Sequence, residues 1–182
     1  MNYVATLVKT GIAITLICIC ISPATVRFAS SAESEKATPC ETAHYRQFDF
    51  WIGDWDAFDV GNLSKVVART RVTRILGGCV LLEDYQGADG HFGQSFTIYD
   101  SSRDRWHQTW VTNQGTLLVI EGGLEDGKMV LRGADQTNNK TRQVRGTWRA
   151  VPEGVQETAV ISTDGGKTWT QWFDLIFRSH KP

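Results

Sequence analysis

Short segments suited to β-strands follow one another along most of this chain, and each ends in a few turn-forming residues. Gly, Asn and Asp fill the separators, as in Gly61-Asn62 and Asn113-Gln114-Gly115. Because every connection is as short as a hairpin, we expect neighbouring strands to be antiparallel. The ten segments are rich in Val, Ile, Thr, Trp, Tyr and Phe and cover 54–60, 66–75, 80–86, 92–100, 105–112, 116–121, 128–133, 141–151, 155–162 and 168–178.

A strongly twisted series of ten antiparallel strands tends to close on itself, because closure removes the unpaired edges. The sequence therefore predicts an all-β fold, an antiparallel up-and-down meander β-barrel of about ten strands. A two-sheet sandwich is the alternative. It normally needs at least one long crossing connection, and the sequence offers none.

The N-terminal part has the pattern of a secretory signal. Lys9 precedes an uncharged apolar run over 11–22, which Pro23 ends, and small residues follow as far as Ala32. A membrane anchor is the alternative, but the run is shorter than the roughly 20 apolar residues of a spanning helix. We therefore expect a signal peptide over 1–32, a leader over 33–44 and one barrel domain over 45–182. The mature chain would be exported, periplasmic or extracellular, with no integral membrane span.

Charge and cysteine content limit the partners and the redox state. Removal of 1–32 would leave 17 basic and 20 acidic residues, interspersed and without a Lys/Arg block, so no nucleic-acid partner is expected. Two cysteines would remain, and an even number in an exported chain favours a Cys40–Cys79 disulfide. Two buried free thiols are the alternative. Chain entropy assigns such a bridge roughly 4 kcal/mol of stabilisation.

The run FDFWIGDW over 48–55 opens the strand series with four large rings around Gly53-Asp54-Trp55. Together with Arg178 on the last segment, it resembles the calycin pattern of lipocalins and fatty-acid-binding proteins, and the mature chain looks like an uncharacterised family of exported bacterial calycin-like proteins. That resemblance implies that Arg178 covers the Trp55 indole where the first and last strands meet. It brings no agreed activity. The expectation of an interior ligand rests on this closure, with Trp55 sealing one mouth.

One further motif has a structural interpretation. Residues 162–169, STDGGKTW, match the Asp-box, a hairpin that sialidase-like propellers repeat. It occurs once here, so we interpret it as a stable hairpin between the last two strands. Signatures such as HExxH, paired CxxC, a phosphate loop or a complete GxSxG do not occur in the sequence, and no metal site is predicted.

Several side chains on the predicted strands could act in catalysis or ligand binding if they point into a barrel. Glu83 and His107 are the candidates for acid–base catalysis, although a lone strand histidine is more often a surface residue. Which strand face points inward cannot be fixed without the register. The aromatic residues at such positions are more often ordinary core than ligand contacts. The candidate ligand-binding residues are Tyr85, Gln94, Phe96, Trp110 and Arg145.

Three classes of function remain after these observations. The first is binding of a small apolar or amphipathic molecule inside a barrel that is wider than its own side chains fill. The second is an enzyme of the isomerase, lyase or hydrolase type that uses interior Glu or His, which requires at least two titratable groups to meet inside with shifted pKa values. The third is a structural envelope protein without a pocket. No cofactor is predicted. A haem-binding variant is suggested by nitrobindin, a calycin-like barrel that holds haem with an interior histidine, but His180 follows the last strand and no other histidine clearly aligns with that ligand.

Overall fold

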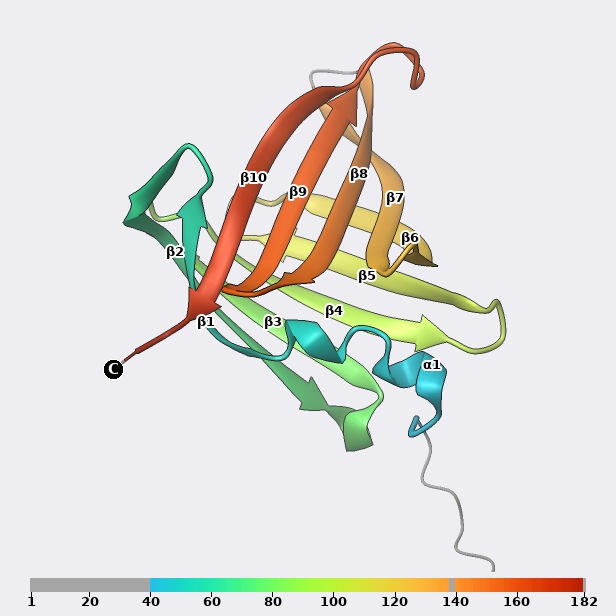
Figure 1. Cartoon of the computed structure of the whole chain (residues 1–182). Helices are drawn as coiled ribbons and strands as arrows, with labels where there is room; N and C mark the ends of the chain where they lie inside the picture. The colour runs from blue at the N-terminus through green and yellow to red at the C-terminus, as the bar shows by residue number, and fades with distance from the viewer. Residues whose placement is uncertain (1–39, 138–139, 182) are drawn as a thin grey trace, which may run out of the picture. The chain divides into compact units, whose positions relative to one another are not determined.

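The structure is a computed structural model that describes residues 40–137 and 140–181. Figure 1 shows its strands following one another around a barrel, with β10 returning to lie beside β1. The predicted signal peptide and residues 33–39 of the predicted leader lie outside the described residues. The ten strands are β1 (Gly53–Asp59), β2 (Asn62–Ile75), β3 (Val80–Gly87), β4 (Phe92–Asp100), β5 (Arg105–Thr112), β6 (Leu117–Glu125), β7 (Lys128–Thr137), β8 (Lys140–Val151), β9 (Gly154–Ser162) and β10 (Thr170–Ser179).

Each strand pairs antiparallel with the next one along the chain, and the β1–β10 pair closes the barrel. Five residue pairs join β1 to β10, from Trp55 opposite Ser179 to Asp59 opposite Leu175. The predicted ten-strand antiparallel meander barrel is therefore confirmed. Among the described residues, no helix is long and apolar enough to span a membrane.

A short N-terminal segment closes one end of the barrel. It contains α1 (Ala43–Arg46) and the 3-10 turn η1 (Asp49–Trp51). Phe48 is fully buried and meets the Trp106 and Trp148 rings edge-on, at centroid distances of 5.8 and 5.5 Å. Trp51 packs edge-on against Phe177 at 4.6 Å. Residues just before the first strand thus supply the core of this end, which we call the closed end.

The disulfide between Cys40 and Cys79 ties this N-terminal segment to the start of β3, as predicted. Two further contacts hold the segment in place. The Trp106 indole N–H donates to Gln47 Oε1 at 3.0 Å, and the Tyr99 hydroxyl lies 2.9 Å from His44 Nδ1. The bridge therefore fixes the start of a segment that covers the closed end.

The contact expected between Trp55 and Arg178 is not formed, and that prediction is wrong. Trp55 and its β10 partner Ser179 fix the register, so Arg178 lies opposite Asp56 and projects to the other side of the sheet. The Arg178 guanidinium lies 4.9 Å from the Phe58 ring centroid instead. Trp55 is buried, stacks on Trp51 at 6.1 Å, and donates its indole N–H to the Trp51 carbonyl at 3.0 Å. Closure is achieved by strand pairing, and Trp51 replaces the arginine as the neighbour of Trp55.

Candidate ligand-binding cavity

A cavity of about 460 Å³ occupies the barrel interior away from the closed end. Its position follows from the aromatic packing, because Phe48, Trp51 and Trp106 fill the closed end. The loops at the opposite end contribute exposed Gln114 and Thr116 to the lining, so the cavity reaches the surface there. The side chains that surround it include Glu83, Tyr85, His91, Gln108, Trp110, Leu118, Ile120, Asp135, Arg142, Val144, Trp148, Glu157, Ala159, Trp172, Phe173 and Leu175.

Aromatic rings form part of the wall, and a glycine makes room for one of them. Tyr85 meets Trp110 edge-on at 5.8 Å, and His91 lies 6.5 Å from the Trp110 ring centroid. A Cβ atom at Gly93 would lie 2.3 Å from Trp110 Cζ2. The inward position of Gly93 on β4 therefore has no room for a larger side chain, because the Trp110 indole of β5 lies over it.

An ion pair and an exposed indole stand at the open mouth. Arg142 donates its Nε–H to Asp135 Oδ1 at 2.9 Å, and its guanidinium lies 4.4 Å from the Trp172 ring centroid. A β-bulge in β10 between Gln171 and Phe173 interrupts the strict alternation of sides. Trp172 and Phe173 consequently both line the cavity although they are consecutive in the chain.

The middle of the cavity is polar on the side of β3, β4 and β5. Glu83 is 8% exposed and accepts a hydrogen bond from the Ser95 hydroxyl to Oε2 at 2.8 Å. Gln108 is also buried, and its side-chain amide donates to Thr97 Oγ1 at 3.0 Å. Burial raises the pKa of the Glu83 carboxyl to about 7; the Ser95 hydrogen bond opposes this rise, and the charge of Asp84 adds to it.

A second carboxyl enters the same cavity from the other side of the barrel. Glu157 on β9 lies opposite Trp148 of β8 and Leu175 of β10 in the strand register. Burial raises its pKa well above the usual value, repulsion from Glu83 raises it further, and the Trp148 indole N–H lowers it. Two carboxyl groups in one poorly solvated space cannot both ionise freely, so the pair retains a proton to higher pH than exposed glutamates do.

Tyr85 stands beside this pair as a neutral hydroxyl donor. Burial, followed by the charges of Glu157, Asp89 and Glu83, raises its pKa to about 12. The phenol therefore stays protonated throughout the physiological range. The cavity combines apolar walls with two carboxyls, one phenol and one amide, which is the composition of a site that orients a small ligand.

The register places some of the predicted site residues in the cavity and others outside it. Glu83, Tyr85 and Trp110 line the cavity. Phe96 does not: it is 46% exposed on the outer face of β4, because Ser95 and Thr97 take the inward positions. Arg145 also lies outside, with its guanidinium 4.9 Å from the Trp169 ring. We therefore do not retain Phe96 and Arg145 as cavity residues.

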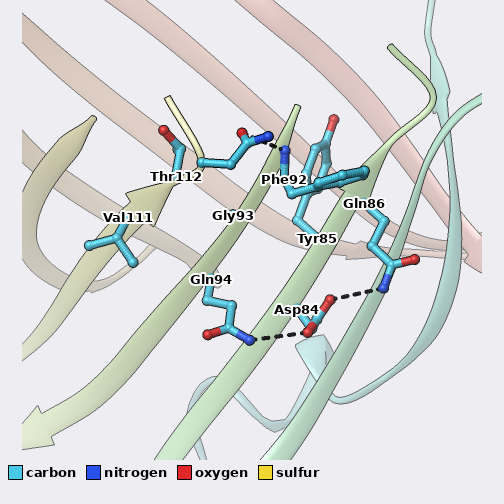
Figure 2. Close-up of a pocket in the computed structure, with 9 residues that line it drawn as sticks. Asp84, Tyr85, Gln86, Phe92, Gly93, Gln94, Val111 and Thr112 are labelled. Carbon is cyan, nitrogen blue, oxygen red and sulfur yellow. Dashed lines mark hydrogen bonds between the residues drawn. The ribbon is translucent and has the colours of Figure 1, made fainter. Parts of the chain in front are cut away.

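Gln94 belongs to a separate groove of about 540 Å³ on the outer face of β3, β4 and β5. Figure 2 shows two amides converging there on one carboxylate. The Gln94 and Gln86 side chains donate to Asp84, at 3.1 and 3.2 Å. Phe92 and Val111 are exposed beside them. The groove is open and meets the cavity lining only at Tyr85 and Thr112. Gln94 itself lies on the exposed face of β4, so it is also corrected to an outward position.

His107, the second catalytic candidate, lies on the outer face of β5. Its Nδ1 is 2.9 Å from Glu121 Oε1 and its Nε2 is 2.9 Å from Thr109 Oγ1. Glu121 is also bound by Arg103 at 2.7 Å, and this hydrogen bond, followed by that from His107, lowers the Glu121 pKa to about 2. His107 is thus part of a surface network and cannot act with Glu83. His180, considered for haem, lies 2.9 Å from Asp56 and does not line the cavity.

Sequence reasoning missed Glu157, Trp148 and Trp172. The alternation of Val155, Glu157 and Ala159 puts Glu157 on the same face as two apolar residues, and the structure shows that face to be buried. No comparable signal identifies Trp172, because strict alternation would put Trp172 and Phe173 on opposite faces of β10, whereas the bulge lets both line the cavity. In the described part of the chain, no group of three or more His, Cys, Asp or Glu could hold a metal ion.

No protein-family model matches the chain, and a search of curated proteins finds no significant relative. The assignment of a site therefore rests on the cavity itself.

Proposed function

We propose that this chain is an exported calycin-like barrel that binds a small apolar or amphipathic molecule in its interior. The observation that carries the proposal is the cavity of about 460 Å³, closed at one end and lined by Tyr85, Trp110 and Trp148. Its volume lies within the range of roughly 300–1,000 Å³ for small-molecule sites. The Cys40–Cys79 disulfide supports the export part of the proposal, because such bridges persist in oxidising compartments.

Native mass spectrometry with a panel of lipids, quinones and aromatic amines tests the proposal. Ala159 is buried and lines the cavity, so Ala159→Phe would fill the space that a ligand needs. Val119→Phe is the matched control, because Val119 is 38% exposed on the outer face. We expect wild type and Val119→Phe to bind the same compounds and Ala159→Phe to lose them. Equal binding by all three proteins, or none by wild type, would contradict the proposal.

A second candidate is proton-transfer catalysis, favoured by the meeting of Glu83 and Glu157 inside one cavity. A carboxyl with a pKa of about 7 can accept or donate a proton near neutral pH. His107 takes no part, so the carboxyl pair would act alone. Deuterium exchange at the α-carbon of small ketones, followed by NMR, should be accelerated by wild type and not by Glu83→Gln. Equal exchange rates with both proteins would remove this candidate.

A further inference from the structure

The cavity lining contains more acidic than basic side chains, even after the Arg142–Asp135 ion pair is left out. The acids in the lining are Glu83, Glu157 and Asp135, and the bases are Arg142 and, when protonated, His91. Arg142 is bound to Asp135 and lies over the Trp172 ring at the mouth. Glu83 and Glu157 therefore have no Lys or Arg paired with them in the described lining, and His91, whose ring lies against Tyr85 and Trp110, is the one base left there.

One oxygen of the Glu83 carboxyl has no hydrogen-bond partner among the described residues. Its Oε2 accepts from Ser95, whereas its Oε1 has no bonded donor among residues 40–137 and 140–181. The carboxyl is more than nine-tenths buried and lines the cavity. A carboxyl oxygen that faces the cavity in this way can accept a hydrogen bond from a bound ligand.

We infer that the ligand of this cavity carries a protonated amine at one end, bound between Glu83 and Glu157, and an apolar or aromatic body against Tyr85, Trp110 and Trp148. The inference rests on the proposed binding function and names its ligand class. A cation between the two carboxylates removes their mutual repulsion and supplies donors to their oxygens. The rings add cation–π attraction, which is strongest where water is excluded.

The same geometry disfavours a ligand whose polar end is a carboxylate or an alcohol. A carboxylate, as in a fatty acid, would meet two acidic side chains, and His91 is the one base of the described lining that is not paired with an acid. An alcohol could accept from the protonated carboxyl or the Tyr85 phenol, but it would leave the repulsion between the two glutamates unrelieved. An ammonium ion is the end group for which both carboxyls can ionise, so its binding should release protons from the pair.

Two sets of matched probes separate these cases: 2-phenylethylamine, 2-phenylethanol and phenylacetate, and octylamine, 1-octanol and octanoate. Titration calorimetry at pH 7 should show each amine binding at least 10-fold more tightly than its alcohol, and each carboxylate most weakly. Repeating the titration in phosphate and in Tris should show different heats for the amines, because the buffers take up the released protons with different enthalpies. The alcohols should give the same heat in both buffers.

The variant series is Glu83→Gln, Glu157→Gln and their combination, with Asp84→Asn as the control. Asp84 is the next residue on β3, carries the same charge and faces the outer groove. We expect the double variant to bind amine and alcohol equally and Asp84→Asn to keep the preference. The proton release of wild type provides a readout that does not depend on the folding of any variant.

The outcomes distinguish this inference from the proposed function. If wild type binds the alcohols as tightly as the amines, or if amines bind without proton release, the amine assignment is wrong and cavity binding stands. If Asp84→Asn abolishes amine binding and the double variant does not, the amines bind in the outer groove and the assignment is wrong. If none of the six probes binds and the wider panel also fails, both proposals are overturned.

Discussion

Replacing Glu83 with glutamine should make the protein more stable, and the gain should grow with pH. Burial raises the pKa of this carboxyl from 4.5 to about 7, so folding favours its protonated form. A group of this kind contributes its full stabilisation below its unfolded pKa and loses it as the pH rises through its folded pKa. At about 1.4 kcal/mol per pKa unit, the loss between pH 4 and pH 8 amounts to about 3 kcal/mol, of which about 2 kcal/mol falls between pH 5 and pH 7.

The substituted glutamine would keep the shape of the side chain and an oxygen for the Ser95 hydroxyl, but it would have no charge to bury. The change also removes the repulsion that Glu83 exerts on Glu157, so the second carboxyl acts in the same direction. The carboxylates with lowered pKa values, such as Glu121 and Asp164 at about 2, lose their contribution only in more acidic solution. The interval from pH 5 to pH 8 therefore excludes these carboxylates. The four histidines are common to wild type and Glu83→Gln, so the difference between the two proteins reports the cavity pair.

The assay is urea unfolding of the oxidised protein at half-unit steps from pH 5 to pH 8, with equal slopes required for comparison. Wild type should lose about 2 kcal/mol or more over this interval, and Glu83→Gln should lose much less. Glu153→Gln makes the same chemical change at an exposed turn and should follow wild type. If Glu83→Gln and wild type decline in parallel, the carboxyl is not desolvated and the argument for the cavity pair fails.

Three other sets of substitutions test the barrel itself. A Cβ at Gly122 would lie 2.0 Å from the Val130 carbonyl oxygen, so Gly122→Ala should cost about 1–3 kcal/mol, whereas Gly123→Ala, with nothing within 4 Å, should be nearly neutral by the same unfolding assay. The Cys40–Cys79 bridge spans 39 residues, so the double substitution to alanine should lower the free energy of unfolding by about 4 kcal/mol; an unchanged urea midpoint would contradict this. Trp51 is 1% exposed and Trp172 is 43% exposed, so Trp51→Ala should cost about 3–5 kcal/mol and Trp172→Ala far less, and a reversed order would refute the role of Trp51 at the closed end.

The strands and their pairing could be predicted because their signals are local. The segments predicted at 92–100 and 105–112 have the same bounds as β4 and β5, since Gly and Asp turns end them on both sides. The direction of each face could not be predicted in the same way. Phe96 belongs to the more apolar face of its strand, yet it lies outside, because Ser95 and Thr97 take the inward positions and the Trp110 ring of β5 lies over the inward Gly93. That choice depends on a neighbouring strand and not on the alternation of β4 alone.

The carboxyl pair shows why a site can be missed in a sequence even when the strand of each of its residues is predicted correctly. Alternation along β9 suffices to place Glu157 on the face of Val155 and Ala159, and Glu83 was identified as a candidate on β3. Neither observation alone distinguishes an interior charge from an error in register, because a shift of one residue turns both side chains to the surface. Closure of β1 on β10 brings β3 and β9 to face one interior, and there each glutamate raises the cost of ionising the other. The chemistry of this cavity is thus a property of the closed barrel, and any change that opens the β1–β10 seam should return both carboxyls to ordinary acidity together.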